Sequence, residues 1–466
     1  MGILGFGTYL PLHRLDRARI GAALGSPAGR GTRTVAAADE DTTTLGVEAA
    51  RNVLRELADG VTPRRLVFAT AEPAYLDKTN ATAIHAALGL PESVPAYDAG
   101  GAVRSAVGAL RVADDASEPT LVVTAGMRTG LPGGADERDG GDGASAFLVG
   151  NVEGARTRTL GWGSSSLEFL ERWRLPGASH SREWEERFGE HVYVPLACRA
   201  FSRALEVSGV AADALDHVVV TGVHPRAART VVRAVGVAPD RVVDDLSSSV
   251  GNTGAAHAGI LLASVLERAE PGARVALLSI ADGADALVLE VIEPATAPAP
   301  SRTLAGQLAG GRPLDSYETF ITWRGFLARE PPRRPDPEAP AAPPSLRHEP
   351  WKFAFTGSRC EQCGEVHLPP ARVCSRCGSV DRMVPVPMAD EQATIVTFTV
   401  DRLAYTPSPP LVAAVLDFDR GGRFRCALTD VDAGAVAIGD RVEMTFRRVD
   451  TAHGVHNYFW KARPIR

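Results

Sequence analysis

The sequence predicts an α/β layered fold of two similar halves, followed by a cysteine-rich ribbon and a small β-barrel. Before residue 330, short β-branched runs alternate with Ala-rich amphipathic segments, as in sheets buried between helices. Short alternating strands separated by Gly, Asp and Pro fill the C-terminal region, as in a small barrel. Between the two lies a C-x2-C-x10-C-x2-C pattern formed by Cys360, Cys363, Cys374 and Cys377.

The composition is that of a soluble globular protein with two or three domains. The chain has 466 residues, of which 45% are hydrophobic and 23% are charged. A net charge of -6 and the lack of a long basic run argue against a nucleic-acid partner. No apolar stretch of about 18 residues occurs, so we expect no membrane association. No signal peptide opens the chain, and its six cysteines favour a reducing, cytoplasmic location.

The first 330 residues show signs of internal duplication, with halves of about 1–155 and 156–330. Buried strands are predicted at 66–70, 121–126, 217–222 and 275–280. The second and fourth of these strands are each followed by a turn rich in Gly and Asp and then by an apolar strand. These segments read GDGASAFLVG from Gly141 and ADGADALVLEV from Ala281.

Four segments of this region match, in order, the segments of one enzyme family. They are ATAEPAYLDK from Ala69, VHPRAARTVV from Val223, VGNTGAA from Val250 and SYETFITWRGFL from Ser316. Residues 1–330 thereby resemble the thiolase superfamily, and within it the 3-hydroxy-3-methylglutaryl-CoA synthases, including their archaeal form. The resemblance implies a duplicated α-β-α-β-α layered fold, a homodimer, and a substrate that is an acyl thioester of coenzyme A or of an acyl-carrier protein.

The same resemblance implies three catalytic residues, Glu72, His224 and Asn252. From the residues alone, each also has a structural reading. Glu72 could be a surface carboxylate at a strand end, His224 a hydrogen-bonded group at the end of a buried strand, and Asn252 part of an ordinary Gly-Asn-Thr turn. His257 is expected to cap or pack rather than to react.

The reactive cysteine of the resembled family is missing. In that family it follows a strand-ending aspartate and occupies a helix N-terminus, where its pKa is lowered. Here Asp98 sets the register, and the fifth residue after it is Val103. Ser105 would lie about 200° further around the helix and should face elsewhere. Cys198 and Cys426 read as small buried apolar residues.

The four spaced cysteines predict a structural zinc site. Each Cys-x-x-Cys pair brings two thiolates to one tetrahedral ion from one tight turn. Gly364 and Gly378 follow the two pairs, where such a turn needs a positive φ. His367 lies nearby, but four cysteines already complete a closed site. The proline-rich segment 331–345 predicts a semi-rigid linker before this module.

Residues 345–466 resemble the DUF35 family, in which a zinc ribbon precedes an OB-fold. The match rests on P-P-x-x-x-C-x-x-C from Pro369 to Cys377 and on four strand-like runs that begin at Ala393, Leu411, Arg423 and Arg441. It implies a zinc ribbon at 346–385 and an OB-fold at 386–466. In relatives this module associates with thiolase-like enzymes and helps to hold the CoA-bearing substrate. A basic, aromatic face for nucleic acid is not evident.

The function that the sequence favours is C–C bond formation or cleavage on an acyl thioester, of the aldol or retro-aldol type, without an acyl-enzyme. Glu72 and His224 would be base and acid, and Asn252 would stabilise an enolate or alkoxide oxygen. One alternative is a conventional synthase or acyltransferase, with Ser105 as a substitute nucleophile or with a shifted register. Another is an inactive acyl-CoA-binding scaffold for a partner thiolase. Arg104 and Arg128 are two of many candidates for contacting CoA.

Overall fold

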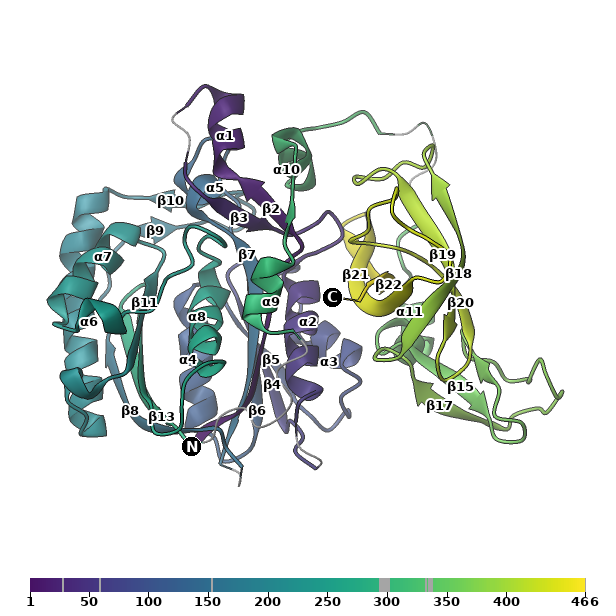
Figure 1. Cartoon of the computed structure of the whole chain (residues 1–466), viewed down its shortest axis with the longest axis horizontal. Helices are drawn as coiled ribbons and strands as arrows, with labels where there is room; N and C mark the ends of the chain where they lie inside the picture. Colours follow the sequence, from purple (N-terminus) through teal and green to yellow (C-terminus); the bar gives the residue numbers. More distant parts are fainter. Residues whose placement is uncertain are drawn as a thin grey trace. The chain divides into compact units, whose positions relative to one another are not determined.

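The protein is described by a computed structural model that divides into two compact units (Figure 1). The first unit comprises Met1–Ala37, Asp41–Thr82 and Glu92–Phe326, and the second Ala38–Glu40, Ala83–Pro91 and Leu327–Arg466. The structure describes residues 1–26, 29–57, 60–151, 154–292, 302–331, 333 and 338–465. The finer domain boundaries given above stay predictions.

Two sheets with corresponding strands form the frame of the first unit. The first has the order β1-β7-β6-β4-β5 and the second the order β8-β13-β12-β11 when read from the equivalent edge. In both sheets, the first strand is antiparallel to the second and the second is antiparallel to the third. The third and fourth strands are parallel to each other. This correspondence confirms the predicted duplication. The bounds are β1 (Gly2–Tyr9), β4 (Arg65–Thr70), β5 (Ala96–Gly100), β6 (Thr120–Met127), β7 (Asp142–Gly150), β8 (Thr157–Ser165), β11 (His217–Gly222), β12 (Arg274–Ile280) and β13 (Ala284–Val291).

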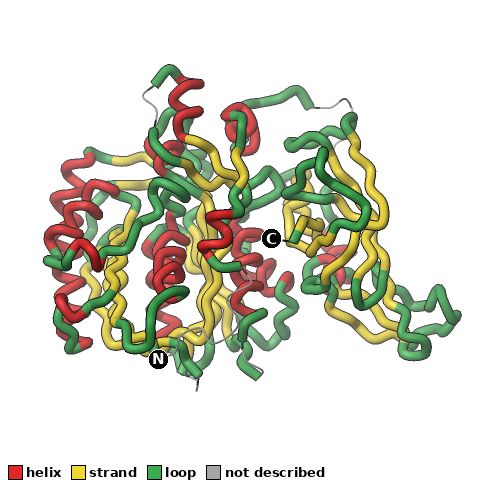
Figure 2. Tube along the Cα trace, in the orientation of Figure 1, coloured by secondary structure: helices red, strands yellow, loops and turns green. Residues whose placement is uncertain are grey.

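Helices fill the space between the two sheets and cover their outer faces (Figure 2). α4 (Arg104–Asp114) and α8 (His257–Leu266) pack between the sheets, where the sequence HAGILLASVL of α8 is apolar almost all round. α2 (Thr42–Leu54) packs against the first sheet. α6 (Glu186–Ser208) and α7 (Pro225–Ala234) cover the second. This is the α-β-α-β-α layering that the resemblance implied.

The remaining elements of the first unit complete its edges. They are β2 (His13–Asp16), α1 (Arg17–Leu24), β3 (Thr32–Val35), α3 (Ala81–Ala87), which extends into the second unit, α5 (Ala135–Asp139), β9 (Arg172–Trp173), β10 (Arg182–Glu183), α9 (Leu304–Ala309), β14 (Arg312–Pro313), α10 (Tyr317–Trp323) and the short 3-10 turns Ala212–Ala214, Pro239–Arg241 and Gly254–Ala256. α10 is the terminal helix expected from SYETFITWRGFL.

One local prediction in the first half is wrong. The Gly- and Asp-rich segment from Gly141 was expected to be a turn, but β7 already begins at Asp142. The Asp142 carboxylate is fully buried and pairs with the guanidinium groups of Arg33 and Arg324. Asp142 Oδ2 also accepts a hydrogen bond from the backbone N–H of Ala36 at 2.7 Å. Buried ion pairing therefore holds an acidic residue inside a strand, where propensity alone disfavours it.

The second unit consists of a small ribbon sheet and a five-stranded barrel. The ribbon order is β16-β15-β17, and the barrel order is β20-β19-β18-β21-β22. An isolated bridge between Leu428 and Ala462 joins the segment after β20 to β22. The bounds are β15 (Thr356–Cys360), β16 (Val366–His367), β17 (Met383–Pro387), β18 (Gln392–Asp401), β19 (Leu411–Phe418), β20 (Arg423–Ala427), β21 (Arg441–Ala452) and β22 (Val455–Pro464). The fold matches the predicted zinc ribbon and OB-type barrel.

The predicted linker at 331–345 is only partly extended. Residues 332 and 334–337 of that call lie outside the described residues. Its last part begins the short helix α11 (Ala342–Arg347), which α12 (Glu349–Lys352) follows. Proline in the first turn of α11 does not oppose the helix, because the N–H groups there have no intrahelical partner.

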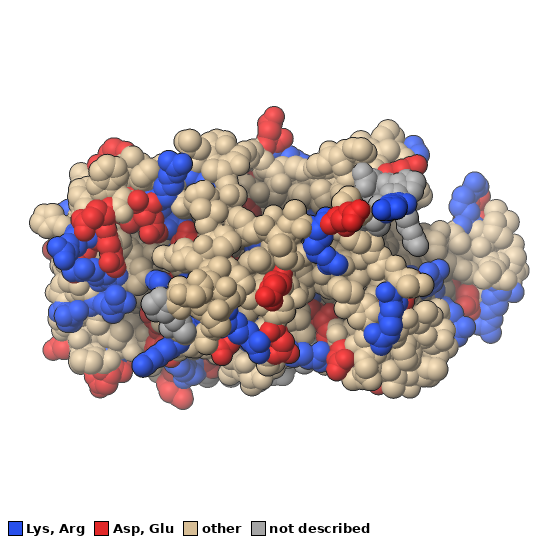
Figure 3. Space-filling model, turned by 90° about the horizontal axis from the view of Figure 1, so that it is seen from above, with Lys and Arg blue, Asp and Glu red and all other residues tan. Residues whose placement is uncertain are grey.

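Charged side chains of both signs are interspersed on the face of the molecule drawn in Figure 3. Among the described residues, we find no helix with the length and apolar character needed to cross a membrane.

Candidate functional site

A cavity of about 790 Å³ in the first unit contains two of the positions singled out from the sequence, Glu72 and Val103. Glu72 follows the C-terminal end of β4 by two residues, and its backbone N–H donates to Thr70 Oγ1 at 3.0 Å. Val103 immediately precedes the first residue of α4. The carboxyl ends of parallel strands are where α/β sheets usually place their reactive groups. We refer to this space as the Glu72 cavity.

Glu72 is held in an environment that favours its neutral form. Its Oε2 atom is buried and has no hydrogen-bond partner among the described residues. The nearest cation is Arg174, whose Nη2 lies 3.9 Å from Glu72 Oε1, beyond hydrogen-bond distance. Burial raises the pKa of Glu72 more than the charge of Arg174, a hydrogen bond from the backbone of Met127 and the charges of Arg172 and Arg128 lower it. A carboxyl group with a raised pKa accepts a proton more readily once it is ionised, as a general base must.

The segment around Val103 has part of the local structure that the family resemblance implied. Asp98 is the middle residue of β5, which continues to Gly100, so it does not end the strand as expected. Its carboxylate accepts hydrogen bonds from the backbone N–H groups of Asn80 and Ala81, both at 2.7 Å. Val103 lies at the N-terminus of α4 and lines the Glu72 cavity. Ser105 donates from Oγ to the Gly100 carbonyl at 3.2 Å and is not among the residues that line this cavity.

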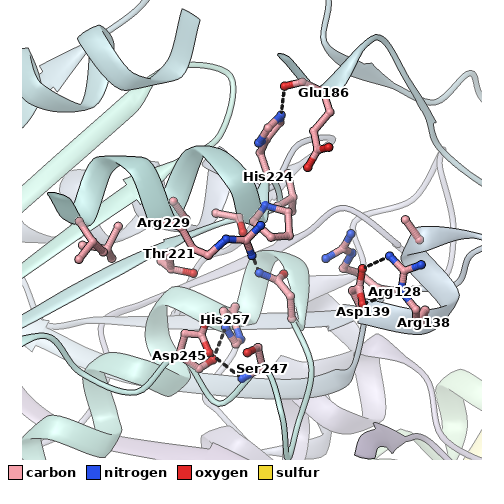
Figure 4. A pocket seen from close by; sticks show the side chains of 18 of the residues that line it. Arg128, Arg138, Asp139, Glu186, Thr221, His224, Arg229, Asp245, Ser247 and His257 are labelled. Atoms are coloured by element: carbon pink, nitrogen blue, oxygen red, sulfur yellow. Dashed lines mark hydrogen bonds and ion pairs between the residues drawn. The ribbon is translucent and has the colours of Figure 1, made fainter. Parts of the chain in front are cut away.

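A neighbouring cavity of about 690 Å³ contains His224, Asn252 and His257. Figure 4 shows several of its side chains, which come from α5, β11, α7 and the loop before α8. We refer to it as the His224 cavity. The Glu72 and His224 cavities share two wall residues, Arg128 and Val223. The structure thus brings His224 and Asn252 together but places Glu72 on the other side of that wall.

His224 follows β11 by two residues and forms the N-cap of α7. Its Nδ1 accepts from the backbone N–H of Ala227 at 3.0 Å, and its Nε2 lies 2.9 Å from the carbonyl oxygen of Glu186 (Figure 4). This pair of contacts corresponds to the neutral imidazole with the proton on Nε2. The side chain is only 5% exposed. Before His224 can transfer a proton to a substrate, the hydrogen bond from Nε2 to the Glu186 carbonyl must therefore be replaced by one to a substrate atom.

Two polar residues lie around the His224 ring. The Tyr193 ring centroid is 5.8 Å from that of His224, and Tyr193 donates from its hydroxyl to Glu171 Oε2 at 3.3 Å. Burial raises the pKa of Glu171, while the proximity of His224 lowers it. Glu171 lines the His224 cavity and was not identified from the sequence.

Asn252 and His257 both have backbone partners. Asn252 Nδ2 donates to the Gly222 carbonyl at 2.9 Å, and its Oδ1 accepts from the Gly254 N–H at 2.9 Å. The amide thus fixes the Gly-Asn-Thr turn and keeps one N–H available to a ligand. Burial lowers the pKa of His257 to about 4, so this residue is neutral at physiological pH.

The four cysteines of the ribbon fit a tetrahedral zinc ion. Their Sγ atoms all lie within 4.8 Å of one another. The Cys360–Cys377 and Cys363–Cys374 Sγ pairs are separated by 3.7 and 3.5 Å, close to the spacing of about 3.8 Å that Zn–S bonds of about 2.3 Å require. Gly364 and Gly378 have φ of 79° and 74°, as predicted.

The two other cysteines differ from each other in burial. Cys426 on β20 is 9% exposed and behaves as the predicted buried residue, with its pKa raised to about 12 by burial. Cys198 on α6 is only partly buried, so the prediction of a buried position is wrong for this residue. Its neighbours Leu196 and Ala197 face the core instead.

Three parts of the chain match known domain families. Residues 205–290 match the C-terminal domain of 3-oxoacyl-[acyl-carrier-protein] synthase III, 353–381 the rubredoxin-like zinc ribbon of ChsH2, and 385–447 the C-terminal OB-fold of ChsH2. The hydroxymethylglutaryl-CoA synthase of Thermococcus gammatolerans is 27% identical over 306 residues, which are 63% of this chain and 86% of that enzyme. That of Methanothermobacter thermautotrophicus is 29% identical over 308 residues, which are 62% and 88%.

Solved structures show the same fold. MvaS in complex with 3-hydroxy-3-methylglutaryl coenzyme A superposes with a TM-score of 0.59 at 21% identity, covering 73% of this chain and 94% of that one. The 3-oxoacyl-[acyl-carrier-protein] synthase III of Aquifex aeolicus gives 0.51 at 20% identity, covering 62% and 99%. This chain therefore joins a domain with the thiolase-like fold of the hydroxymethylglutaryl-CoA synthases to a zinc ribbon and an OB-fold of the ChsH2 type.

Proposed function

We propose that this protein is an enzyme that forms or cleaves a C–C bond of an acyl thioester in the Glu72 cavity, without a covalent acyl-enzyme. The observation that carries the proposal is that one cavity contains both Glu72 and the apolar Val103 at the N-terminus of α4. Glu72 Oε2 has no hydrogen-bond partner within the described part of the chain. The cavity thus contains a group that can transfer protons, whereas the position expected to hold the nucleophile has only an alkyl side chain.

The proposed reaction needs only proton transfer and charge stabilisation from the protein. In the synthetic direction, Glu72 takes a proton from the carbon next to the thioester carbonyl, and the resulting enolate carbon attacks a carbonyl carbon. The substrate would have to reach past the shared wall residues Arg128 and Val223, so that the new alkoxide can take the Nε2 proton of His224 once that proton is released from the Glu186 carbonyl. Cleavage runs through the same steps in reverse. The available N–H of Asn252 would stabilise the oxyanion.

Substrate carrier and partners are proposed by analogy with the relatives. One similar structure contains 3-hydroxy-3-methylglutaryl coenzyme A, and another, the curacin-pathway HMG synthase, contains a donor acyl-carrier protein. We propose a coenzyme A or carrier-protein thioester as substrate and a cytoplasmic location. We also propose a homodimer, because β5 is an edge strand whose Tyr97 is 56% exposed.

The test is intact-protein mass spectrometry after incubation with a panel of acyl-CoAs, together with product analysis. We expect C–C bond turnover and no mass adduct for the natural protein. Val103→Cys should gain an acyl adduct, because a thiol at a helix N-terminus has a lowered pKa and lines the same cavity as Glu72. Ser105→Cys serves as the matched control, since the Ser105 side chain is directed to the Gly100 carbonyl.

The outcomes separate the three functions. An adduct on Ser105 or on any native cysteine would establish an acyltransferase or conventional synthase and overturn the proposal. Binding without adduct or turnover would show an inactive scaffold for a partner thiolase. Thioester turnover without an adduct, lost in Glu72→Gln, would support the proposed reaction.

A further inference from the structure

A hydrogen-bonded pair of buried side chains, Tyr193 and Glu171, connects the two cavities. Tyr193 on α6 lines the Glu72 cavity, and Glu171, which directly precedes β9, lines the His224 cavity. Tyr193 donates from its hydroxyl to Glu171 Oε2 at 3.3 Å. The two residues are only 1% and 4% exposed. One hydrogen bond, shielded from bulk solvent, thus runs from the side of the Glu72 cavity to that of the His224 cavity.

The Tyr193 hydroxyl has the hydrogen-bonding capacity that a proton carrier needs. Its oxygen accepts a hydrogen bond from the backbone N–H of Asp282, another residue of the Glu72 cavity, at 3.2 Å. A phenolic oxygen can donate one hydrogen bond and accept two, so one acceptor position remains for an incoming proton. The ring contacts those of Phe169 and His224, with centroid distances of 5.0 and 5.8 Å, which fixes its position. Burial raises the pKa of Tyr193, so the hydroxyl stays neutral between transfers.

Glu171 is placed to pass a proton between Tyr193 and His224. Within the described part of the chain, Tyr193 is the only hydrogen-bond donor to a Glu171 carboxylate oxygen. Burial raises the pKa of Glu171, and the charge of His224 is the largest effect that lowers it. A Cβ placed on Gly189 would lie 2.6 Å from His224 Nε2 and 3.0 Å from Glu171 Cγ. The glycine therefore leaves the space in which the Glu171 and His224 side chains can meet.

We propose that Tyr193 is a catalytic residue of the Glu72 cavity and that, with Glu171, it conducts the proton of His224 to the substrate oxygen. The proposal rests on the proposed function, and it spares the substrate from reaching past the wall residues shared by the two cavities. The alkoxide takes the hydroxyl proton of Tyr193, and Tyr193 takes the proton of the neutral Glu171 carboxyl. Glu171 in turn takes the Nε2 proton of His224, once the Glu186 carbonyl releases it. In the cleavage direction the proton returns along the same path.

The test separates this relay from the removal of a proton by Glu72, because the relay acts only on the alkoxide. The full chain is incubated in heavy water with the panel of acyl-CoAs named above. Mass spectrometry follows both C–C bond turnover and the exchange of hydrogen for deuterium at the carbon next to the thioester. Tyr193→Phe should lower turnover about 10²- to 10⁴-fold and leave the Glu72-dependent exchange unchanged. Glu171→Gln should behave in the same way.

Tyr317→Phe is the matched control, because it removes a hydroxyl from a second buried tyrosine–glutamate pair of the first unit. Tyr317 donates to Glu137 Oε1 at 2.8 Å, and neither of these residues lines the Glu72 or the His224 cavity. This control should keep full exchange and full turnover. Thermal melting verifies the fold of each variant.

The outcomes distinguish the relay from the proposed function. Full turnover in Tyr193→Phe overturns the relay but leaves the proposed function standing. An equal loss of exchange and turnover in Tyr193→Phe also overturns the relay, since Tyr193 would then only support the structure of the Glu72 cavity. A natural protein that catalyses neither exchange nor turnover with any acyl-CoA of the panel overturns both proposals.

Discussion

Glu72 lies in an environment that disfavours its charged form, although its proposed role as a base requires that form. Its Oε2 is buried without a partner, and burial raises its pKa. A carboxyl whose pKa is raised by folding stabilises the protein fully below its ordinary pKa, and this contribution is lost as pH rises through the raised pKa. The ionised form of Glu72, which the proposed base requires, therefore costs folding stability.

This predicts opposite effects of Glu72→Gln on stability and on activity. The difference in melting temperature between the variant and the natural protein should shift in favour of the variant as pH rises. The reason is that glutamine removes the charge that burial disfavours. Turnover should fall by about 10²- to 10⁴-fold, and the natural enzyme should gain activity as pH rises through the raised pKa. Calorimetry and initial rates between about pH 4 and 9 check both.

Asp77→Asn provides the control for this experiment. Asp77 is an exposed carboxyl on the same loop and does not line the Glu72 cavity. The control should match the natural protein in both measurements. A Glu72→Gln variant that keeps full turnover would remove Glu72 from the mechanism.

At the scale of the element, the N-terminus of α7 gives His224 two duties that can be separated. The imidazole Nδ1 caps the helix through Ala227, and Nε2 is the group proposed to act on substrate. Asparagine is a good N-cap residue but has no imidazole. His224→Asn should therefore keep the stability of the natural protein and lose turnover. His224→Ala should lose both, with a stability cost of about 1 kcal/mol.

Urea unfolding and turnover assays measure these two effects. Full activity in His224→Asn would show that capping is the whole role of His224. Gly189→Ala tests independently whether the position of the His224 ring matters. An added Cβ would lie 2.6 Å from His224 Nε2 and would displace the ring.

Periodicity predicted the positions of four buried strands of the first unit closely. The strands at 66–70, 121–126, 217–222 and 275–280 differ from β4, β6, β11 and β12 by at most one residue at either end. β22 escaped notice, although His453 and Gly454, with φ of 51° and 77°, form the two-residue turn that marks a hairpin. The ion pairs that keep Asp142 inside β7 come from residues distant in sequence, so no local pattern could reveal them.

The site was less predictable than the fold. The sequence supplied Glu72, Val103, His224 and Asn252, but not the wall that separates the two cavities. Arg128 was one arginine among many candidates. Its position directly after β6 would have singled it out, because β6 lies beside and parallel to β4, whose end leads to Glu72.

At the scale of the whole molecule, the folding of the zinc ribbon should depend on bound metal, whereas the folding of the layered first unit should not. The four cysteine Sγ atoms are the only described group of three or more metal-ligating side chains found within ligand distance of one another. Removing zinc with a chelator, or substituting Cys374→Ser, should increase amide hydrogen exchange in β15, β16 and β17. Exchange in β4, β6, β11 and β12 should stay unchanged. Increased exchange in those four strands would contradict this expectation.

The proposed homodimer is tested at its open edge. β5 pairs with β4 on one side, and Tyr97 projects from it with 56% of its surface exposed. Placing a charge on an edge strand opposes pairing with a second copy. Tyr97→Lys should therefore convert a dimer into a monomer in light scattering, whereas Tyr97→Phe should not. A natural protein that is monomeric at micromolar concentration would refute the dimer.

The matching order of the two sheets places the two proposed catalytic groups at equivalent positions. β4 in the first half corresponds to β11 in the second, and each is followed after two residues by one of these groups, Glu72 or His224. The same place on the two sheets therefore carries a carboxyl in one half and an imidazole in the other. The proposed pairing of base and acid would thus be a chemical asymmetry on two sheets of matching strand order.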